Sequence, residues 1–314
     1  MVGPILITGA TGFVGSCLMR SLVQDGYDVH IFSRKDSNKW RIDDLLKDVA
    51  DYSVDLRDLV SVEQTVDNIK PSVIFHLATY GGFASQNNIA EIVDSNLMGT
   101  INLVNACAKV GFECFVNTGS SSEYGTKHEP MKEHDLLEPV GTYGVSKAAT
   151  TLYCRSVAIE KNLPIITHRL FSPYGPWDDP KRLIPYLISS FLRGKNPNLS
   201  VPTSVRDFVY IDDVIEAYMK IANKPSNKSL IYNIGSGEQY TIGQIVELLA
   251  DITGHNVTPT WRAVNKQRPE PEVWLADIDN AKRYLDWSPK TTLRSGLEKT
   301  VDWFRTNLDL YRYD

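Results

Sequence analysis

The sequence predicts an α/β protein built on a parallel, doubly wound sheet. Short apolar runs alternate with longer helical patterns over residues 5–171, which is the rhythm of repeated βα units. Because parallel strands are joined by crossover helices, this order implies a sheet with helices on both faces. The expected helices begin near Gly12, Asp58, Ile89 and Thr142. The expected strands span residues 5–8, 28–33, 51–55, 73–78, 114–119 and 165–171.

The helix that begins near Ile89 shows how these assignments are made. Its apolar residues Ile92, Leu97, Ile101 and Val104 follow helical spacing and form one stripe. A stripe of this kind is typical of a helix that packs against a sheet, so we expect this helix to cover one face of it.

A second, smaller domain is predicted after Ser172. Six prolines, at positions 173, 176, 180, 185, 197 and 202, break the chain there into short pieces. The segments 210–222 and 231–234 nevertheless have the patterns of a helix and a strand that return to the sheet. We therefore expect two interleaved domains. The first comprises residues 1–171 and about 205–234, and the second comprises residues 172–204 and 235–314.

Composition excludes several classes of protein. The 314 residues carry a net charge of -5, so the sequence lacks the basic surface that nucleic acids or anionic membranes require. No stretch approaches the roughly 18 apolar residues of a membrane span. The four cysteines are scattered, and no spacing of cysteines or histidines indicates a metal site. With a first strand at residue 5 there is no room for a signal peptide, so we expect a cytoplasmic protein with reduced thiols.

Three glycines directly after the first strand indicate a dinucleotide. Gly9, Gly12 and Gly15 follow the strand at intervals of three and lead into a helix. They allow a tight turn, close approach of a pyrophosphate, and close packing of the helix on the strand. Thr11, Phe13 and Val14 complete the turn and the helix start, where unpaired N–H groups favour phosphate. A glycine-rich turn without a ligand is the alternative, but the strand before and the helix after favour a Rossmann-type cofactor site.

The end of the second strand distinguishes between the two nicotinamide dinucleotides. An acidic residue there binds the ribose hydroxyls of NAD, whereas an arginine accommodates the 2′-phosphate of NADP. This chain has Ser33, Arg34 and Lys35, which favour NADP(H), with NAD as the alternative. The alternative that residues 33–35 form a solvated loop with no role in cofactor binding also stays open. At the end of the third strand, Asp55 and Leu56 are candidates for the edge of the adenine.

Tyr143 and Lys147 are the candidate catalytic pair. They lie four residues apart in a predicted helix, and therefore on one face. A nearby ammonium lowers the pKa of a phenol, which suits the phenol to exchange a proton with a sugar hydroxyl. The strand 114–119 ends in a run of hydroxyl residues, 120–122, at the edge where α/β sheets bind ligands. One of these serines is expected to hydrogen-bond the reacting oxygen.

Together these residues resemble the extended short-chain dehydrogenase/reductase family, in the NAD-dependent epimerase/dehydratase group that acts on nucleotide sugars. The resemblance runs through almost the whole chain. It includes the glycine turn and the Tyr-x-x-x-Lys pair, followed by blocks at 76–78, 96–100, 169–176, 206–214 and 285–289.

The resemblance implies roles for individual residues. Tyr143 is the acid-base residue, Lys147 its activator and a ribose ligand, and Ser121 or Ser122 the group that polarises the substrate oxygen. It also implies a homodimer and a nucleotide-diphosphate sugar bound by the second domain. The further cofactor contacts implied are Leu77, Ala78 and Asn96. The further substrate contacts implied are Glu123, Arg206, Arg268 and Ser172, the last standing where the family commonly has Asn.

Three reactions are compatible with such a site. A 4,6-dehydratase typically carries Thr-Asp-Glu in the active-site turn, and the run Ser121-Ser122-Glu123 lacks the aspartate, which disfavours dehydration. We expect an NADPH-dependent reductase of a 4-keto-deoxysugar nucleotide, because it matches the residues at 33–35. An NAD-dependent nucleotide-sugar 4-epimerase is the alternative. A protein that binds NADP without catalysis is a further alternative, and the retained Tyr143 and Lys147 argue against it.

Overall fold

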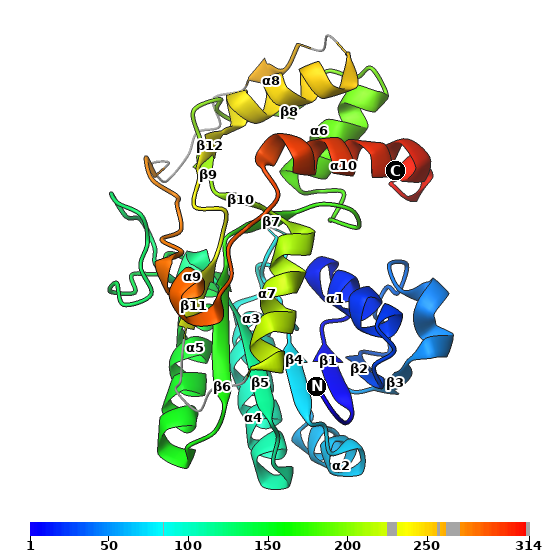
Figure 1. Cartoon of the computed structure of the whole chain (residues 1–314), viewed down its shortest axis with the longest axis vertical. Helices are drawn as coiled ribbons and strands as arrows, with labels where there is room; N and C mark the ends of the chain where they lie inside the picture. The colour runs from blue at the N-terminus through cyan, green and yellow to red at the C-terminus, as the bar shows by residue number, and fades with distance from the viewer. Residues whose placement is uncertain (84, 225–230, 256–257, 262–270, 312–314) are drawn as a thin grey trace.

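A seven-stranded parallel sheet forms the centre of the molecule (Figure 1). The computed structural model describes residues 1–83, 85–224, 231–255, 258–261 and 271–311. The strand order is β11-β6-β5-β4-β1-β2-β3, so successive strands run outward in both directions from β1. This confirms the predicted doubly wound sheet. The strands are β1 Ile5–Thr8, β2 Val29–Ser33, β3 Ala50–Ser53, β4 Val73–His76, β5 Cys114–Ser120, β6 Ile165–Leu170 and β11 Ile231–Ile234.

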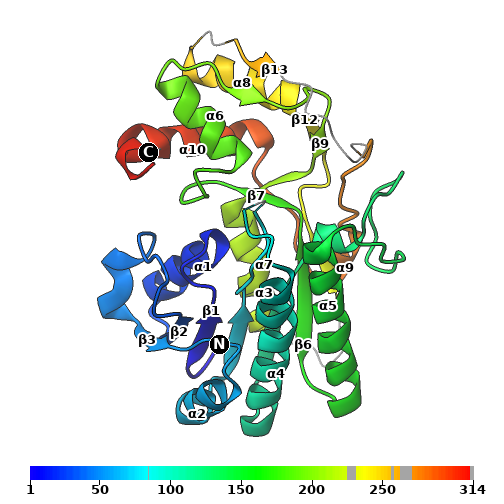
Figure 2. The same ribbon diagram turned by 180° about the vertical axis from the view of Figure 1, so that it is seen from behind.

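Helices cover both faces of this sheet because the strands are apolar on both sides. In β1, Ile5 and Ile7 pack in the same buried cluster as α1 and α7, whereas Leu6 packs in the cluster that contains α2, α4 and α5. Figure 1 shows α1 and α7 in front of the sheet, and Figure 2 shows the opposite face with α4 and α5. These helices are α1 Phe13–Gln24, α2 Leu59–Ile69, α4 Gly99–Val110, α5 Thr142–Lys161 and α7 Ile211–Asn223.

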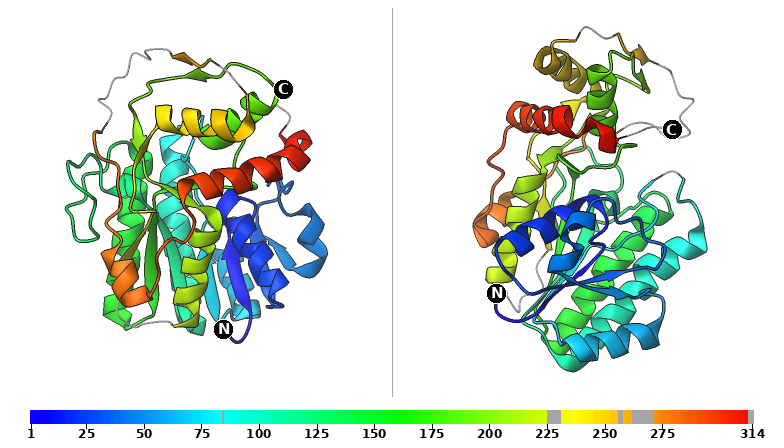
Figure 3. Two further views of the ribbon diagram at one scale, coloured as in Figure 1. Left: turned by 45° about the horizontal axis from the view of Figure 1, so that its top comes forward. Right: turned by 90° about the vertical axis from the view of Figure 1, so that its right-hand side faces the viewer.

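The chain leaves the sheet after β6 and returns to it as β11, which pairs with β6 in parallel. Between these two strands, β7 pairs with β10, and β9 pairs with β12 from further along the chain. Helices α6, α8 and α10 lie together above one end of the sheet (Figure 3). The remaining elements are α6 Leu183–Leu192, α8 Ile242–Thr253, α9 Asp279–Leu285, α10 Leu293–Asn307, β7 Ser172–Tyr174, β8 Asn198–Leu199, β9 Val205–Arg206, β10 Phe208–Tyr210, β12 Tyr240–Thr241 and β13 Thr260–Trp261.

The helix predicted from Ile89 is interrupted. It consists of α3, Ile89–Val93, then a π-helical turn, Asp94–Met98, and then α4. Such a turn inside a helix is often found at a functional site. Here it buries Asn96, whose amide binds both the N–H and the carbonyl of Tyr80, each at 2.8 Å.

Three short 3-10 turns complete the described chain. They are η1 Asp43–Asp48, η3 Ser121–Glu123 and η4 Leu308–Leu310. Of these, η3 directly follows β5 and carries the serine run. None of the helices in the described ranges combines the length and the apolar content that crossing a membrane demands.

Candidate active site

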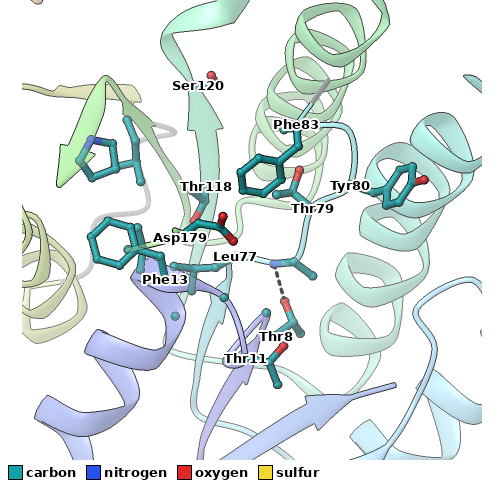
Figure 4. A pocket seen from close by; sticks show the side chains of 18 of the residues that line it. Thr8, Thr11, Phe13, Leu77, Thr79, Tyr80, Phe83, Thr118, Ser120 and Asp179 are labelled. Atoms are coloured by element: carbon teal, nitrogen blue, oxygen red, sulfur yellow. Dashed lines mark hydrogen bonds between the residues drawn. The ribbon is translucent and has the colours of Figure 1, made fainter. Parts of the chain in front are cut away.

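A cavity of about 660 Å³ lies at the carboxyl ends of β1, β4 and β5 (Figure 4). Its walls come from the glycine turn, the ends of β2 and β3, the loop after β4, the serine run and helix α5. The segment 170–182 before α6 and the residues Arg206 and Trp274 close the far end. Most of the residues singled out from the sequence therefore face one space.

The glycine turn has the geometry of a phosphate cradle. Gly9 has φ +76°, and a Cβ on it would lie 2.6 Å from the N of Ala78. A Cβ on Gly15 would lie 2.2 Å from the carbonyl oxygen of Gly9, so no larger residue fits there. Helix α1 begins at Phe13 with Gly12 as an N-cap that has no side chain to satisfy the first N–H groups. The residues Gly9, Thr11, Gly12, Phe13, Val14 and Gly15 all line the cavity, and a dinucleotide pyrophosphate fits this cradle.

A chain of buried side chains fixes the floor of the cavity. The ring of His76 joins the Thr8 hydroxyl, at 2.6 Å, to the Thr100 hydroxyl, at 2.7 Å. Burial lowers the pKa of His76 to about 3, so the ring is neutral. The Thr8 hydroxyl also accepts the N–H of Ala78 at 3.4 Å, which holds Leu77 and Ala78 on the cavity wall (Figure 4).

The end of β2 presents a hydroxyl and a cation to the cavity. Ser33 and Arg34 line it, whereas Lys35 is exposed and lies outside the lining. Asp51 on β3 accepts the Ser33 hydroxyl at 2.7 Å and the ammonium of Lys39 at 2.6 Å, and the carboxylate of Asp36 lies 3.7 Å from Nε of Arg34. Asp51 does not line the cavity. This wall therefore offers no carboxylate from β2 to a ribose.

Asp55 and Leu56 line the same end of the cavity, as expected for residues at the edge of an adenine. The hydrogen bonds from Arg57 hold the pKa of Asp55 below its usual value. Arg57 Nη2 lies 2.5 Å from Asp55 Oδ2, so the carboxylate is fixed in place. Arg34 also lies close enough to contribute to that lowering.

Helix α5 brings Tyr143 and Lys147 to the cavity on one face, as their spacing predicts. The ammonium of Lys147 donates to the carbonyl of Thr118 at 2.7 Å, and burial lowers its pKa to about 8. Burial raises the pKa of Tyr143, and the groups that act against this are Ser120, Arg182 and Thr79. The ammonium keeps its positive charge in this hydrogen bond, and the lowering of the phenol's pKa by Lys147 stays a prediction.

Ser120 is the serine beside the phenol. Its side chain is within hydrogen-bonding reach of Tyr143, and it caps η3 by accepting the N–H of Ser122 at 3.1 Å. Ser121 and Ser122, the two serines favoured from the sequence, also line the cavity. The correction to Ser120 follows from its place as the last residue of β5. The Ser-x-x-Glu spacing of a capping box was a signal for it in the sequence.

Glu123 does not contact the cavity, which corrects its expected role as a substrate contact. It is 0% exposed and accepts Arg169 Nε at 2.7 Å, Thr151 Oγ1 at 3.0 Å and Ser120 N at 2.9 Å. A Cβ on Gly119 would lie 2.5 Å from its carboxylate, so a glycine is needed there. Glu123 supports the serine turn from beneath.

Asn96 is likewise a supporting residue and not a cofactor contact. It is 2% exposed and does not line the cavity. Besides binding Tyr80, it donates to the hydroxyl of Ser146 on α5 at 2.9 Å. The amide thus fixes the loop after β4 against the catalytic helix.

Two arginines, Arg182 and Arg206, line the cavity and come from segments that follow the catalytic helix α5 in the chain. The guanidinium of Arg206 lies 5.4 Å from the ring centre of Trp274, and Ser172 lines the wall nearby. Arg182 lines the cavity closer to Tyr143. Arg182 and Trp274 were not singled out from the sequence, because no local pattern marks them. Arg268, an expected substrate contact, lies outside the described residues.

Comparisons with known proteins identify the family of this chain. The model of the NAD dependent epimerase/dehydratase family matches residues 5–235. An uncharacterized UDP-glucose epimerase of Bacillus subtilis is 30% identical over 95% of this chain and 96% of its own length. The UDP-glucose 4-epimerase of Thermotoga maritima, solved with UDP-glucose, superposes with a TM-score of 0.90 at 29% identity, covering 97% of this chain and 99% of its own. The UDP-glucuronic acid 4-epimerase of Bacillus cereus, solved with UDP-glucuronic acid and NAD, gives 0.86 at 28% identity, covering 97% and 99%.

The Glu123 and Arg169 pair predicts a stability effect. Changing Glu123 to Gln leaves the guanidinium buried and unpaired, and we expect a loss of about 3–5 kcal/mol in the free energy of unfolding. Urea denaturation measures it, with Glu129→Gln on the exposed loop as the matched control. Equal midpoints for the two variants would contradict the assignment of Glu123 as a structural ion-pair partner.

Proposed function

Because this chain belongs to the NAD dependent epimerase/dehydratase family, we propose that it acts at C4 of a nucleotide-linked sugar, as an NADPH-dependent reductase of a 4-keto-deoxysugar nucleotide. That it is an NAD(P)-dependent enzyme follows from the family and its relatives. The direction of the reaction and the choice of NADP are our proposal.

The residues that would hold the cofactor line one half of the cavity. The glycine turn would bind the pyrophosphate, Asp55 and Leu56 the adenine, and Leu77 and Ala78 the stretch between. When bound, the reduced nicotinamide supplies hydride to the sugar carbon.

The observation that carries the choice of NADP is the wall formed by Ser33 and Arg34. A guanidinium suits a 2′-phosphate, whereas a carboxylate at that place would repel it. The carboxylate of Asp51 is bound by Ser33 and Lys39, and Asp51 does not line the cavity. A reductase that takes up NADPH for each turnover matches such a wall.

The protonation state of Tyr143 is compatible with reduction. Reduction of a ketone needs a phenol that is protonated and gives its proton to the developing alkoxide. Burial raises the pKa of Tyr143, which keeps the phenol protonated at neutral pH. Ser120 would orient the sugar oxygen for this transfer, and Arg206 would bind the diphosphate at the far end.

The turn after β5 presents no carboxylate to the cavity that could support dehydration. The hydroxyl beside Tyr143 belongs to Ser120, and the next two residues are Ser121 and Ser122. Glu123 is enclosed by Arg169 and cannot reach the cavity. The turn therefore offers hydroxyls only.

A 4-epimerase is the second candidate, favoured by the relatives. The solved structures that resemble this chain include 4-epimerases bound to UDP-glucose or to UDP-glucuronic acid and NAD. In that reaction the phenol would exchange a proton with the oxygen at C4, and the 4-keto intermediate would rotate in the cavity and take the same hydride back on its other face. UDP-linked sugars are the first substrates to test for this activity.

Purification separates the two candidates. We expect the chain to emerge without bound dinucleotide and to oxidise added NADPH, faster than NADH, when given a nucleotide 4-keto sugar. Absorbance of the reduced nicotinamide measures both rates. Retention of NAD, together with interconversion of C4 epimers without added cofactor, would contradict the reductase and support the epimerase.

The proton path predicts the effects of two substitutions. Tyr143→Phe removes the acid, and Ser120→Ala removes the group that orients the sugar oxygen. We expect kcat to fall by about 10²–10⁴-fold in the first variant, as for loss of a general acid. Turnover of Ser121→Ala is the comparison, and a larger loss there than in Ser120→Ala would return the role to Ser121.

The wall formed by Ser33 and Arg34 predicts a change in cofactor preference. In Arg34→Ala a charged hydrogen bond to the 2′-phosphate is lost, so we expect KM for NADPH to rise by about 10–100-fold. KM for NADH should stay unchanged. Steady-state kinetics with both cofactors tests this, with Lys35→Ala as the control outside the lining. Equal effects on the two cofactors would argue against phosphate recognition by Arg34.

A further inference from the structure

Asp207 joins segments that close the far end of the cavity. It directly follows Arg206, which lines the cavity, but its own side chain is 0% exposed and lies outside the lining. Its Oδ1 accepts the N–H and the hydroxyl of Ser236, at 2.6 and 2.7 Å. Its Oδ2 accepts the N–H groups of Gly237, at 3.1 Å, and Ala276, at 3.0 Å. One buried carboxylate therefore binds both the turn after β11 and the segment before α9.

The main chain of Asp207 adds a third segment. Its carbonyl accepts the N–H of Ser172 at 3.0 Å, which connects β7 to the same residue. Ser172, Arg206 and Trp274 all line the cavity. The first is bound by Asp207, the second precedes it in the chain, and the third lies two residues before the bound Ala276. Three residues of the wall therefore depend on the contacts of one enclosed residue.

The space around the carboxylate leaves it little freedom to move. A Cβ built on Gly235 would lie 2.7 Å from Oδ2 of Asp207 and also 2.7 Å from the Cβ of Ala276. Both distances are shorter than van der Waals contact, so only a glycine allows the carboxylate and Ala276 to approach as closely as they do. Because protein interiors are close-packed, a methyl group added at Gly235 must displace one of these two neighbours.

Other polar contacts also hold the segment that carries Trp274. The side chain of Gln239 accepts the N–H of Trp274 at 3.1 Å and donates to the carbonyl of Glu272 at 3.3 Å. From the loop after η3, the main chain of Met131 binds residues 275 and 277, at 2.8 and 2.9 Å. Asp207 differs from these two anchors because it adjoins Arg206 in the chain. Its carboxylate therefore relates the position of the guanidinium to that of the indole, whose ring centre lies 5.4 Å away.

We propose that Asp207 is a positioning residue that sets the affinity for the nucleotide diphosphate by fixing Arg206 and Trp274 relative to each other. This rests on the proposed function, in which Arg206 binds the diphosphate. A guanidinium forms two parallel hydrogen bonds to a phosphate only when its fork is aligned with the oxygens. Within the described chain, the hydrogen bonds of Asp207 reach none of the residues 9–15 of the glycine turn. Its loss should therefore affect the nucleotide diphosphate and leave the dinucleotide unaffected.

The test compares two ligands in one variant. Asp207→Asn keeps the size of the side chain but replaces one acceptor oxygen with an NH₂ group, which then faces N–H groups that are donors themselves. We expect the Kd of UDP to rise by about 10-fold, because a small misplacement of a binding group is enough for such a loss. The Kd of NADPH should stay unchanged. Isothermal titration calorimetry measures both, and dTDP and GDP are titrated in parallel with UDP.

Two further variants separate this role from general destabilisation. Gly235→Ala displaces the same contacts without altering the carboxylate, and it replaces Asp207→Asn as the deciding variant if the latter does not fold. Asp213→Asn is the matched control, because Asp213 is also buried and accepts two N–H groups, at 3.0 and 3.1 Å, outside the cavity lining. It should lower stability and leave both Kd values unchanged. Urea denaturation verifies that each variant is folded.

A double variant tests whether Asp207 acts through the wall. If it does, its loss and the loss of the indole are coupled, and their effects are not independent. The rise in the Kd of UDP in Asp207→Asn/Trp274→Ala should then be smaller than the product of the two single rises. Independent effects, which multiply, would contradict a role through Trp274.

The outcomes separate this proposal from the proposed function. An unchanged Kd of UDP in the deciding variant overturns the role of Asp207, and so does an equal weakening of UDP and NADPH or the same loss in Asp213→Asn. A wild-type chain that binds none of UDP, dTDP and GDP overturns it as well. Because binding needs no turnover, the titrations stay readable even if no nucleotide 4-keto sugar is reduced, and that failure would count against the proposed function alone.

Discussion

The buried ion pair between Glu123 and Arg169 supports the catalytic edge of the sheet. It joins the turn after β5 to the neighbouring strand β6, at 2.7 Å, with both side chains almost fully enclosed. Two buried charges are expensive to desolvate, and they are tolerated because further hydrogen bonds satisfy them. Glu123 also accepts the N–H of Ser120, so the serine beside the phenol is fixed by the same carboxylate. The ion pair therefore fixes the position of the turn at residues 120–123.

The same polar network extends from the sheet to the C-terminal segment. Arg169 donates to the hydroxyl of Tyr124, which in turn donates to Asn233 on β11. Asn233 then binds the carbonyls of Met131 and Asp277. Buried hydrogen bonds of this kind are unfavourable to break, because each orphaned partner pays its full desolvation cost. They hold the segment that carries Trp274 over the cavity.

The electrostatics of the site come from enclosure more than from neighbouring charges. Burial raises the pKa of Tyr143 and lowers the pKa of Lys147 to about 8, so both groups are pushed toward their neutral forms. Tyr143 is therefore protonated and able to donate its proton, whereas the negative charge that the donation leaves on the phenol is unfavourable in this buried site. Ser120, which acts against the raised pKa of Tyr143, is a hydroxyl group placed to reduce the cost of that transfer.

The sequence by itself determined the sheet, the cofactor cradle and the catalytic helix. Alternating apolar patterns, the turn at Gly9 and the helical spacing of Tyr143 are local features, and local geometry dictates where such residues point. Only the tertiary structure decided three features of the site. These are the serine that lies beside the phenol, the burial of Glu123, and the position of Arg182 on the cavity wall. Each depends on contacts between segments far apart in the chain, and packing, not local spacing, sets those distances.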